Sequence, residues 1–151
     1  MMEDEYVSKH EDFFIRVLKK EPSLVLRVHA VTILAEIGEK NSVLALAEVL
    51  AKDPDPLVKH EAAFSMGQIG NPLGNEALEK AVREDPHAIV RHEAAAALGS
   101  IGSQSSRATL ELALQDDDEI VRNSAKASLF NLKFLREHSG GTSARDRAPR
   151  P

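Results

Sequence analysis

Two histidine–glutamate pairs are the clearest candidates for a metal-binding site in this sequence. Residues 58–61 read VKHE and residues 90–93 read VRHE, so His60 and Glu61 recur 32 residues later as His92 and Glu93. Imidazole nitrogens and carboxylate oxygens are both ligands of transition metals. Two histidines and one carboxylate on one side of a metal, with open positions on the other, form the arrangement of non-haem Fe(II) oxygenases. The pairs therefore predict a metal site built from His60, Glu61, His92 and Glu93.

The two pairs lie inside a longer internal repeat. Three sets of equivalent residues recur at a spacing of 32, namely Gly38, Gly70 and Gly102, then Leu46, Leu78 and Leu110, and finally Asp53, Asp85 and Asp117. The valine that follows Val58 and Val90 arrives one residue early, at Val121, which indicates a single deletion before Ile120. A sustained period of this length is the signature of stacked supersecondary units.

Each repeat is expected to form a helical hairpin. First helices are predicted over residues 42–52, 75–84 and 107–115, and second helices over about 57–69, 89–101 and 120–135, with one more beginning near Leu26. Proline in the turns of the middle units stops one helix and aspartate caps the next, while glycine closes the second helix in three units, as a left-handed cap requires. Hairpins that share a core with their neighbours predict an all-α protein, a right-handed α-solenoid of about four units.

The helical period also separates a buried face from an exposed one. The apolar stripe of the second helix in the middle unit is Val58, Ala62, Ala63, Met66 and Ile69, and it must face the core. We expect residues 1–10 to be a flexible N-terminus and residues 11–137 to form the repeat domain, opening with a helix at about 11–20. Residues 138–151 have no helical period and are expected to be a disordered tail.

Neighbouring parallel helices lie about 8–10 Å apart, so equivalent side chains on adjacent second helices can meet. The two pairs should therefore converge on one exposed patch of the concave face. The alternative is ordinary solvent-facing polarity, because glutamate is a good helix former. A site is favoured because the outer repeats lack the pair, with Val28 and His29 in one and Asn123 and Ser124 in the other. Gly67, two turns beyond His60, indicates close approach of either a ligand or a neighbouring helix.

Composition excludes several classes of function. The net charge of −5 argues against broad attraction to nucleic acid or anionic membrane. The absence of cysteine excludes disulfides, thiolate ligands and a cysteine nucleophile. No apolar run approaches the roughly 20 residues of a membrane span, and the N-terminus lacks an apolar signal core. Serine-hydrolase and phosphate-loop motifs are also missing. We expect a cytoplasmic protein that binds neither nucleic acid nor membrane.

The segments HEAAFSMGQIG and VRHEAAAALGSIG resemble the HE motifs of deoxyhypusine hydroxylases, which are HEAT-repeat di-iron enzymes. The resemblance runs from about residue 27 to residue 135. Phycobilin-lyase-like repeats share its alanine-rich pattern, but the twinned His-Glu is specific. It implies that His60, His92 and Glu93 ligate iron, and that Glu61 lies beside the metal or meets the substrate amine in a catalytic role. The implied activity is an iron-dependent monooxygenase that hydroxylates the deoxyhypusine side chain of a translation factor.

The sequence carries two HE pairs where that family has four, in two similar halves. A homodimer would supply the missing pairs, because a two-fold axis presents the same patch on both subunits. The expected cofactor is Fe(2+), in a di-iron centre shared between two chains, and the expected partners are a second copy and a protein or peptide substrate on the concave face. Two other functions stay open: a non-catalytic HEAT-repeat scaffold for protein–protein interaction, and a subunit that assists bilin attachment.

Overall fold

The computed structural model describes residues 2–139 as a row of antiparallel helix pairs. Within this range there are eight α-helices, two single 3₁₀ turns and no β-strand, which confirms the predicted all-α solenoid. The helices are α1 (Met2–Lys20), α2 (Leu24–Ile37), α3 (Lys40–Lys52), α4 (Pro56–Ile69), α5 (Asn75–Glu84), α6 (Ala88–Ile101), α7 (Arg107–Ala113) and α8 (Glu119–Ser139). The 3₁₀ turns precede α5 and α7, at Pro72–Gly74 and Gln104–Ser106.

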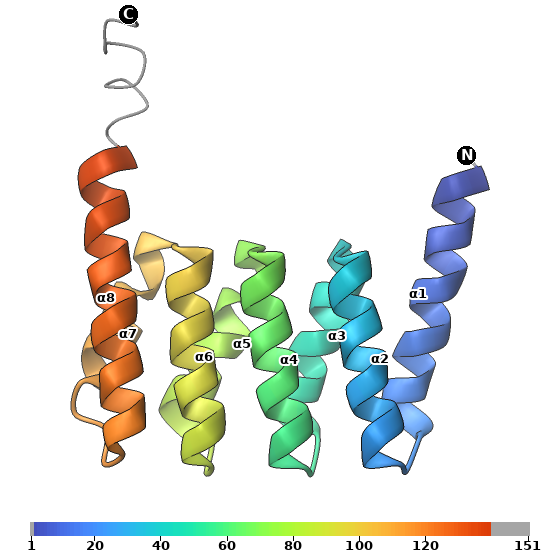
Figure 1. Ribbon diagram of the computed structural model, residues 1–151, viewed down its shortest axis with the longest axis horizontal. Coiled ribbons are helices and arrows are strands. Elements are labelled where there is room, and N and C mark those ends of the chain that lie inside the picture. Colours follow the sequence, from blue (N-terminus) through green and yellow to red (C-terminus); the bar gives the residue numbers. More distant parts are fainter. Residues whose placement is uncertain (1, 140–151) are drawn as a thin grey trace, which may run out of the picture.

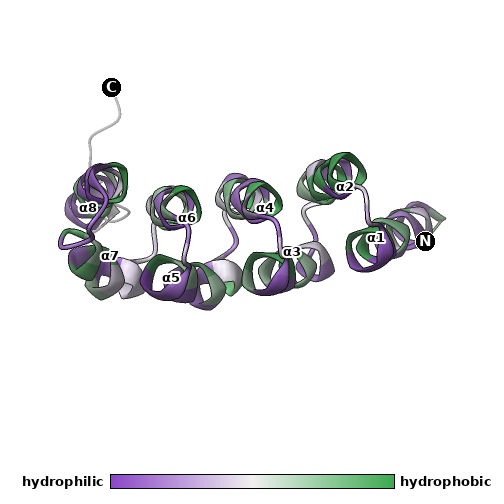
Figure 2. Cartoon of the chain, turned by 90° about the horizontal axis from the view of Figure 1, so that it is seen from below, coloured by the Kyte–Doolittle hydropathy of each residue, from purple (hydrophilic) through white to green (hydrophobic). Residues whose placement is uncertain are grey.

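The helices form two layers. Figure 1 shows α2, α4, α6 and α8 side by side and parallel, each rising from a turn at the lower edge of the view. Seen along the helices, the row bows gently, with these four on its inner side (Figure 2). We call α2, α4, α6 and α8 the inner layer, and α1, α3, α5 and α7 the outer layer. The inner layer therefore presents a continuous, slightly concave face.

Local sequence sets the helix ends. Gly38, Gly70 and Gly102 end α2, α4 and α6 with φ of 63°, 72° and 79°, the left-handed conformation that glycine adopts without steric cost. At the other end of α4, the Asp55 carboxylate accepts a hydrogen bond of 2.8 Å from the Leu57 amide. The predicted glycine caps are confirmed, and they give α2, α4 and α6 the same length of 14 residues.

A ladder of ion pairs joins the inner layer to the turns between the layers. Arg27 lies 3.1 Å from Asp53, Lys59 lies 3.0 Å from Asp85, and Arg91 lies 3.0 Å from Asp116. The prediction that Asp117 is the equivalent of Asp53 and Asp85 is therefore wrong. Asp116 takes that place and Asp117 is exposed, because the deleted residue lies in the turn before Asp116.

The core is shared between neighbouring repeats. The predicted stripe of α4 is confirmed, since Val58, Ala62, Ala63 and Met66 are at most 1% exposed. Leucines from both layers complete this core, among them Leu34, Leu46, Leu78, Leu98, Leu110 and Leu132. Because α4 packs on α6 and α6 on α8 more extensively than other pairs, the centre of the inner layer is the most tightly supported part of the array.

The N-terminal boundary of the helical array differs from the sequence expectation, and most of the expected C-terminal tail is not described by the structure. Residues 2–10, expected to be flexible, continue α1 as helix, and the opening helix begins at Met2. Within α1 the Glu11 carboxylate is buried and accepts hydrogen bonds from the Ser42 amide and hydroxyl at the start of α3. Residues 140–151, most of the expected disordered tail, lie outside the described range. No helix in the described part of the chain is long and apolar enough to cross a membrane.

Candidate metal centre

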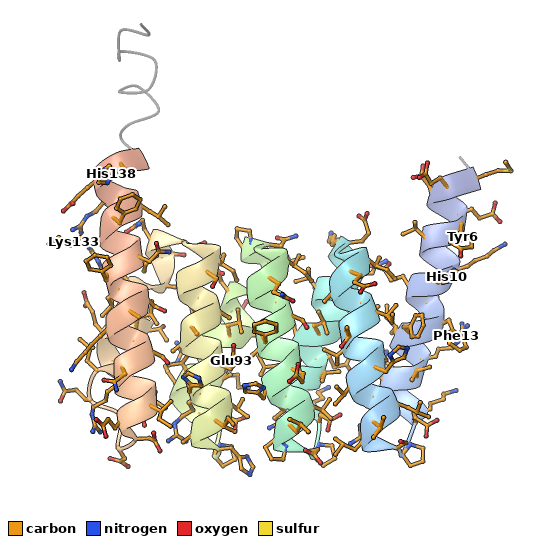
Figure 3. The ribbon with its side chains drawn as sticks, in the orientation of Figure 1. Tyr6, His10, Phe13, Glu93, Lys133 and His138 are labelled. Atoms are coloured by element: carbon orange, nitrogen blue, oxygen red, sulfur yellow. The ribbon has the colours of Figure 1, made fainter. Side chains whose placement is uncertain are left out.

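The predicted site residues lie one turn into α4 and α6, at the middle of the inner layer. His60 and Glu61 project from α4, and His92 and Glu93 project from α6. Figure 3 shows Glu93 between the two helices. Their side chains are half-buried, with exposed fractions from 14% for Glu93 to 33% for Glu61. The fold therefore brings together, from two repeats, the residues that the sequence singled out.

One oxygen of Glu93 faces both imidazole rings. Its Oε2 lies 3.0 Å from His60 Nε2 and 3.7 Å from His92 Nε2. The two Nε2 atoms and this carboxylate are the nitrogen and oxygen donors of a two-histidine, one-carboxylate site. His60 Nδ1 is buried and has no hydrogen-bond partner, although Glu61 Oε1 lies 3.4 Å away. The donor chemistry of the two Nε2 atoms and the carboxylate fits a metal ion.

The arrangement is closed as it stands. Among residues 2–139, no group of three or more histidine, aspartate or glutamate side chains is spaced to hold a metal ion. Glu93 Oε2 lies within hydrogen-bond distance of His60 Nε2, so the carboxylate and the imidazole pair directly with each other. Metal binding would replace this direct contact, a change that side-chain torsions alone can make.

Ser124 on α8 is a site residue that sequence analysis did not identify. Its hydroxyl makes a hydrogen bond with His92 Nδ1, on the side of the ring away from Glu93. Ser124 occupies the repeat position of Glu93 and Glu61, so each histidine contacts the residue at that position in the next repeat. Sequence analysis counted Ser124 as evidence that its repeat lacked the pair. Ser124 could have been identified from the repeat spacing, if each histidine had been expected to contact the next repeat instead of its own.

Glu61 contacts His60 on the side away from Glu93 and also lines a groove between α2 and α4. The groove has a volume of about 450 Å³. Its lining residues are Thr32, Ala35, Glu36, Glu61, Phe64, Ser65 and Gln68. The Phe64 ring is 45% exposed, so the groove combines an aromatic wall with two carboxylates. Such a surface suits a cationic group carried on an apolar chain.

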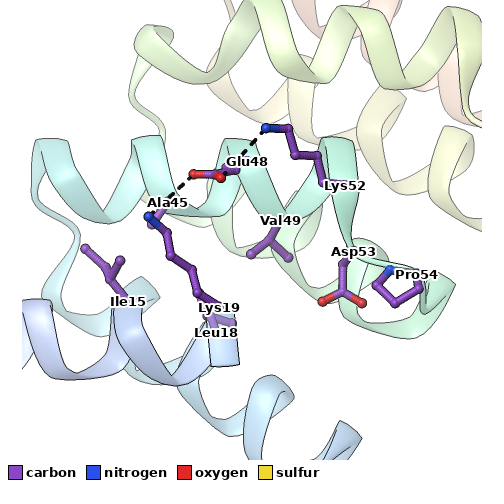
Figure 4. Close-up of a pocket in the computed structure, with 9 residues that line it drawn as sticks. All are labelled: Ile15, Leu18, Lys19, Ala45, Glu48, Val49, Lys52, Asp53 and Pro54. Carbon is purple, nitrogen blue, oxygen red and sulfur yellow. Dashed lines mark ion pairs between the residues drawn. The ribbon is translucent and has the colours of Figure 1, made fainter. Parts of the chain in front are cut away.

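A second hollow lies on the other side of the molecule. It sits between α1 and α3 in the outer layer, with a volume of about 230 Å³ (Figure 4). The polar side chains around it are already paired, with Glu48 4.0 Å from Lys19 and 3.9 Å from Lys52, and Asp53 bound to Arg27. Neither histidine–glutamate pair lines it, so the inner face is the better candidate site.

Ionic contacts at the base of α6 fix the orientation of the helix that carries His92 and Glu93. Hydrogen bonding to Asp116 raises the pKa of Arg91 above its ordinary value, against the opposing effect of burial. Burial would raise the pKa of Asp116, but hydrogen bonds from Arg91 and from the Asp118 amide, with the charges of Arg91 and Arg122, lower it overall. Both groups are therefore charged at neutral pH and anchor α6 to the α7–α8 turn.

Comparison with known proteins gives a matching family model and a set of structural relatives, among them a human enzyme. The model of the family described as HEAT repeats matches residues 11–98 and again residues 43–129. The structure of human deoxyhypusine hydroxylase, determined in complex with glycerol, superposes with a TM-score of 0.84 at 23% sequence identity. The match covers 91% of this chain and 48% of that one, so the chain spans about half the length of the human enzyme. No curated protein sequence matches the chain.

At this level of identity the structural match shows a shared fold, which agrees with the resemblance drawn from the HE segments. The family match rests on more than half of the chain and includes both histidine–glutamate pairs. The helix pairs, their glycine caps and their shared core are the structural counterpart of that match. The chain belongs to the HEAT-repeat family.

Proposed function

We propose that this protein binds iron through His60, His92 and Glu93 and acts as an oxygenase of deoxyhypusine-hydroxylase type. The observation that carries the proposal is the position of Glu93 Oε2, which faces the Nε2 atoms of both histidines at 3.0 and 3.7 Å. The resemblance of the HE segments to that family supports iron over other metals. Bound iron would supply the activation of dioxygen that no side chain of this sequence provides.

The protein's own residues would orient the donors. With the proton of His92 on Nδ1, shared with Ser124 Oγ, the Nε2 lone pair points toward Glu93 and is free to bind a cation. Glu93 would release His60 Nε2 and turn its carboxylate to the metal. The packing of α4 on α6 would hold the two rings in place throughout, because both helices are fixed by a buried core.

Glu61 would bind the substrate. The groove that it shares with Glu36 and Phe64 opens beside the metal ligands and presents two carboxylates next to an exposed ring. A protonated amine would pair with a carboxylate while its methylene chain packs on Phe64. This is the role that the resemblance implies for Glu61, and it is consistent with a lysine-derived side chain presented by a protein or peptide.

A second copy of the chain would complete a two-metal centre. One chain offers a single set of His60, His92 and Glu93, at the middle of its inner face. Two faces related by a two-fold axis would bring two such sets together, as the half-length match to the human enzyme suggests. The protein would then be a homodimer that holds a di-iron centre between its subunits.

Metal content per chain tests the proposal. Protein loaded with Fe(II) under anaerobic conditions and desalted should carry about one iron per chain, measured by elemental mass spectrometry. His60→Ala and His92→Ala should each remove that iron and leave the far-ultraviolet circular dichroism unchanged, because neither side chain belongs to the core. His10→Ala, a change on the exposed surface of α1, is the control and should keep its iron. Full iron retention in both site variants would show that the assignment is wrong.

The alternative is a scaffold that binds a protein partner without metal. It is favoured by the closed contact between Glu93 and His60, which needs no ion to hold it. Under this reading, protein loaded with Fe(II), Mn(II) or Zn(II) would retain none of them. The histidine–glutamate cluster would then act only as a polar tie between α4 and α6.

A further inference from the structure

A row of exposed apolar side chains runs across the inner layer, one turn below the histidine–glutamate cluster. Its members are Val25 on α2, Leu57 on α4, Ile89 on α6 and Ile120 on α8, each in the first turn of its helix. They occupy the same repeat position, and their exposed fractions are 74%, 46%, 53% and 59%. We refer to these four residues as the apolar row.

The fold does not require an apolar residue at this position. The next residue in each of the last three repeats, Val58, Val90 and Val121, is fully buried and provides the core contact. The outer layer shows no comparable row: Leu44 is exposed, but the same repeat position holds Glu76 in α5 and Ala108 in α7. Four large apolar side chains exposed in line on one face therefore indicate a surface that a binding partner covers.

The charges beside the apolar row do not oppose its burial. Arg27, Lys59 and Arg91 lie two residues beyond members of the row, and each pairs with an aspartate of the same chain at 3.0–3.1 Å. Arg122, at the same position in α8, donates to the Asp116 carbonyl oxygen at 2.7 Å. A partner that covers the row would not have to neutralise or desolvate an unpaired cation.

We propose that the apolar row is the seam through which two copies of this chain join face to face. This inference rests on the proposed shared metal centre, because the row has the same centre as the metal ligands. The row and the histidine–glutamate cluster are each divided equally about the space between α4 and α6, with α2 and α8 on either side. If a two-fold axis parallel to the inner helices places the histidine–glutamate clusters of the two copies opposite each other, it also places their apolar rows opposite each other. It opposes Leu57 to the partner's Ile89, and Val25 to the partner's Ile120.

The seam closes only one end of the space between the copies. Beyond the cluster, the exposed residues of the inner face are mostly polar, among them Thr32, Glu36, Gln68 and Ser100, with the Phe64 ring beside them. This region stays hydrated and is the route by which a substrate would reach Glu61. Each face also carries Glu36, Glu61 and Glu93, so two unloaded faces repel one another. The dimer should therefore form, or tighten strongly, when a divalent cation is bound.

Sedimentation velocity with and without anaerobic Fe(II), with iron measured in each species, tests the seam. The wild-type protein should shift from monomer toward dimer on loading. Ile89→Asp should remain monomeric at concentrations where the loaded wild type is dimeric, while still taking up iron. Aspartate suits the first turn of a helix, so this change leaves α6 folded. Leu112→Asp, on the exposed surface of α7, is the matched control and should dimerise normally.

The outcomes separate the two proposals. A wild-type chain that binds iron but stays monomeric overturns the seam and leaves the metal site standing. A chain that binds no iron but dimerises through the row overturns the metal site and leaves the seam. A chain that is monomeric under all conditions, or an Ile89→Asp variant that dimerises like wild type, overturns the seam.

Cross-linking tests the pairing itself, since the sequence contains no cysteine. Copies with Leu57→Cys and copies with Ile89→Cys should be joined by a short thiol-specific cross-linker when mixed and loaded, and neither should cross-link efficiently alone. Val25→Cys mixed with Ile120→Cys should behave in the same way. Cross-linking of Leu57→Cys to Val25→Cys at equal yield would show that the copies do not meet in this register.

Discussion

His92 is held from both sides of its ring, by Ser124 at Nδ1 and by Glu93 near Nε2. The partner on the far side of a metal-binding histidine fixes the tautomer and the ring orientation, and its loss lowers metal affinity about 10–100-fold. Ser124 would therefore be a positioning residue for the proposed metal, and it lies on a third helix, α8. The site thus draws on three successive repeats although only two carry the histidine–glutamate pair.

Replacement of Ser124 tests this role. Ser124→Ala should weaken metal binding by roughly 10–100-fold in an anaerobic Co(II) titration followed by visible absorbance, with no loss of thermal stability. Ser124→Thr, which keeps the hydroxyl, should recover most of the affinity. Asn123→Ala, a change at the exposed neighbour, is the control. Unchanged affinity in Ser124→Ala would show that the hydroxyl does not orient His92.

Gly67 in α4 and Gly99 in α6 allow neighbouring helices to pack closely, and they do not mark the approach of a ligand. A Cβ atom added at Gly99 would lie 2.8 Å from the Ser128 Cα atom, whereas one added at Gly67 would lie 3.0 Å from both Cα and Cβ of Ala97. Contact with a backbone atom at 2.8 Å forces α6 and α8 apart. Of the two explanations that the sequence left open, packing against the neighbouring helix is the one that the structure supports.

These two positions predict different costs for the same substitution. Gly99→Ala should lower the free energy of unfolding by about 1–3 kcal/mol, since overpacking outweighs the gain in helix propensity. Gly67→Ala should be closer to neutral, because its contact is milder and alanine favours helix by about 1 kcal/mol. Urea denaturation followed by circular dichroism measures both. Equal costs would mean that the helices adjust freely to an added methyl group.

At the scale of the helices, the ion-pair ladder shows how sequence spacing can mislead by one residue. The period of 32 selected Asp117, but the side chain that binds Arg91 is Asp116. A repeat spacing only counts residues, so it does not show whether a given aspartate lies before or after the deleted residue. The helix ranges themselves were predicted well, because apolar periodicity, proline and glycine are local signals. The start of α1 was not, because its N-terminal half is polar and its one buried side chain there, Glu11, is held by α3.

The lowered pKa of Asp116 makes its contribution to stability depend on pH. Because the native pKa lies below the ordinary value of about 3.9, the carboxylate stabilises the fold at higher pH, and the effect is lost as pH falls through that range. Asp116→Asn should therefore reduce stability by about 1–3 kcal/mol at pH 7, and the difference from wild type should shrink toward pH 3. Urea unfolding at several pH values measures this.

Asp117→Asn is the matched control for that change. Asp117 is exposed and adjoins Asp116 in the same turn, so its replacement alters the local charge equally. Its effect on the free energy of unfolding should stay within about 0.5 kcal/mol. A larger cost for Asp117→Asn than for Asp116→Asn would restore the assignment that the simple spacing gave.

At the scale of the whole molecule, stability should be highest at the centre of the row. Within residues 2–139 each repeat packs mainly on its neighbours, so α4 and α6 are supported on both sides while α1 and α8 each pack on a repeat on one side. Amide hydrogen exchange should be slowest in α4 and α6 and faster toward both ends. Slower exchange in α1 than in α6 would contradict this order. The candidate metal ligands therefore lie on the least mobile helices of the array.

The architecture was predictable from sequence because a repeat array is specified one unit at a time. The positions of His60, His92 and Glu93 followed from the same register, as residues on adjacent, equivalent helices. The closed contact between Glu93 and His60 and the contribution of Ser124 could not be predicted, because both depend on the offset between neighbouring helices. That offset is set by how side chains pack, which the period of the repeat does not encode.

The polar contacts of the site tie inner helices together on the inner side of the bow, His60 to Glu93 and His92 to Ser124. With layers about 10 Å apart, lengthening such a contact by about 1 Å rotates one repeat against the next by roughly 6°. Metal that is taken up by side-chain rotation alone would leave the spacing of α4 and α6 unchanged, and small-angle scattering of the Ile89→Asp monomer should give the same radius of gyration with and without iron. The cluster would then act as a fixed tie, which keeps the span between the two ends of the molecule the same whether or not the small site is occupied.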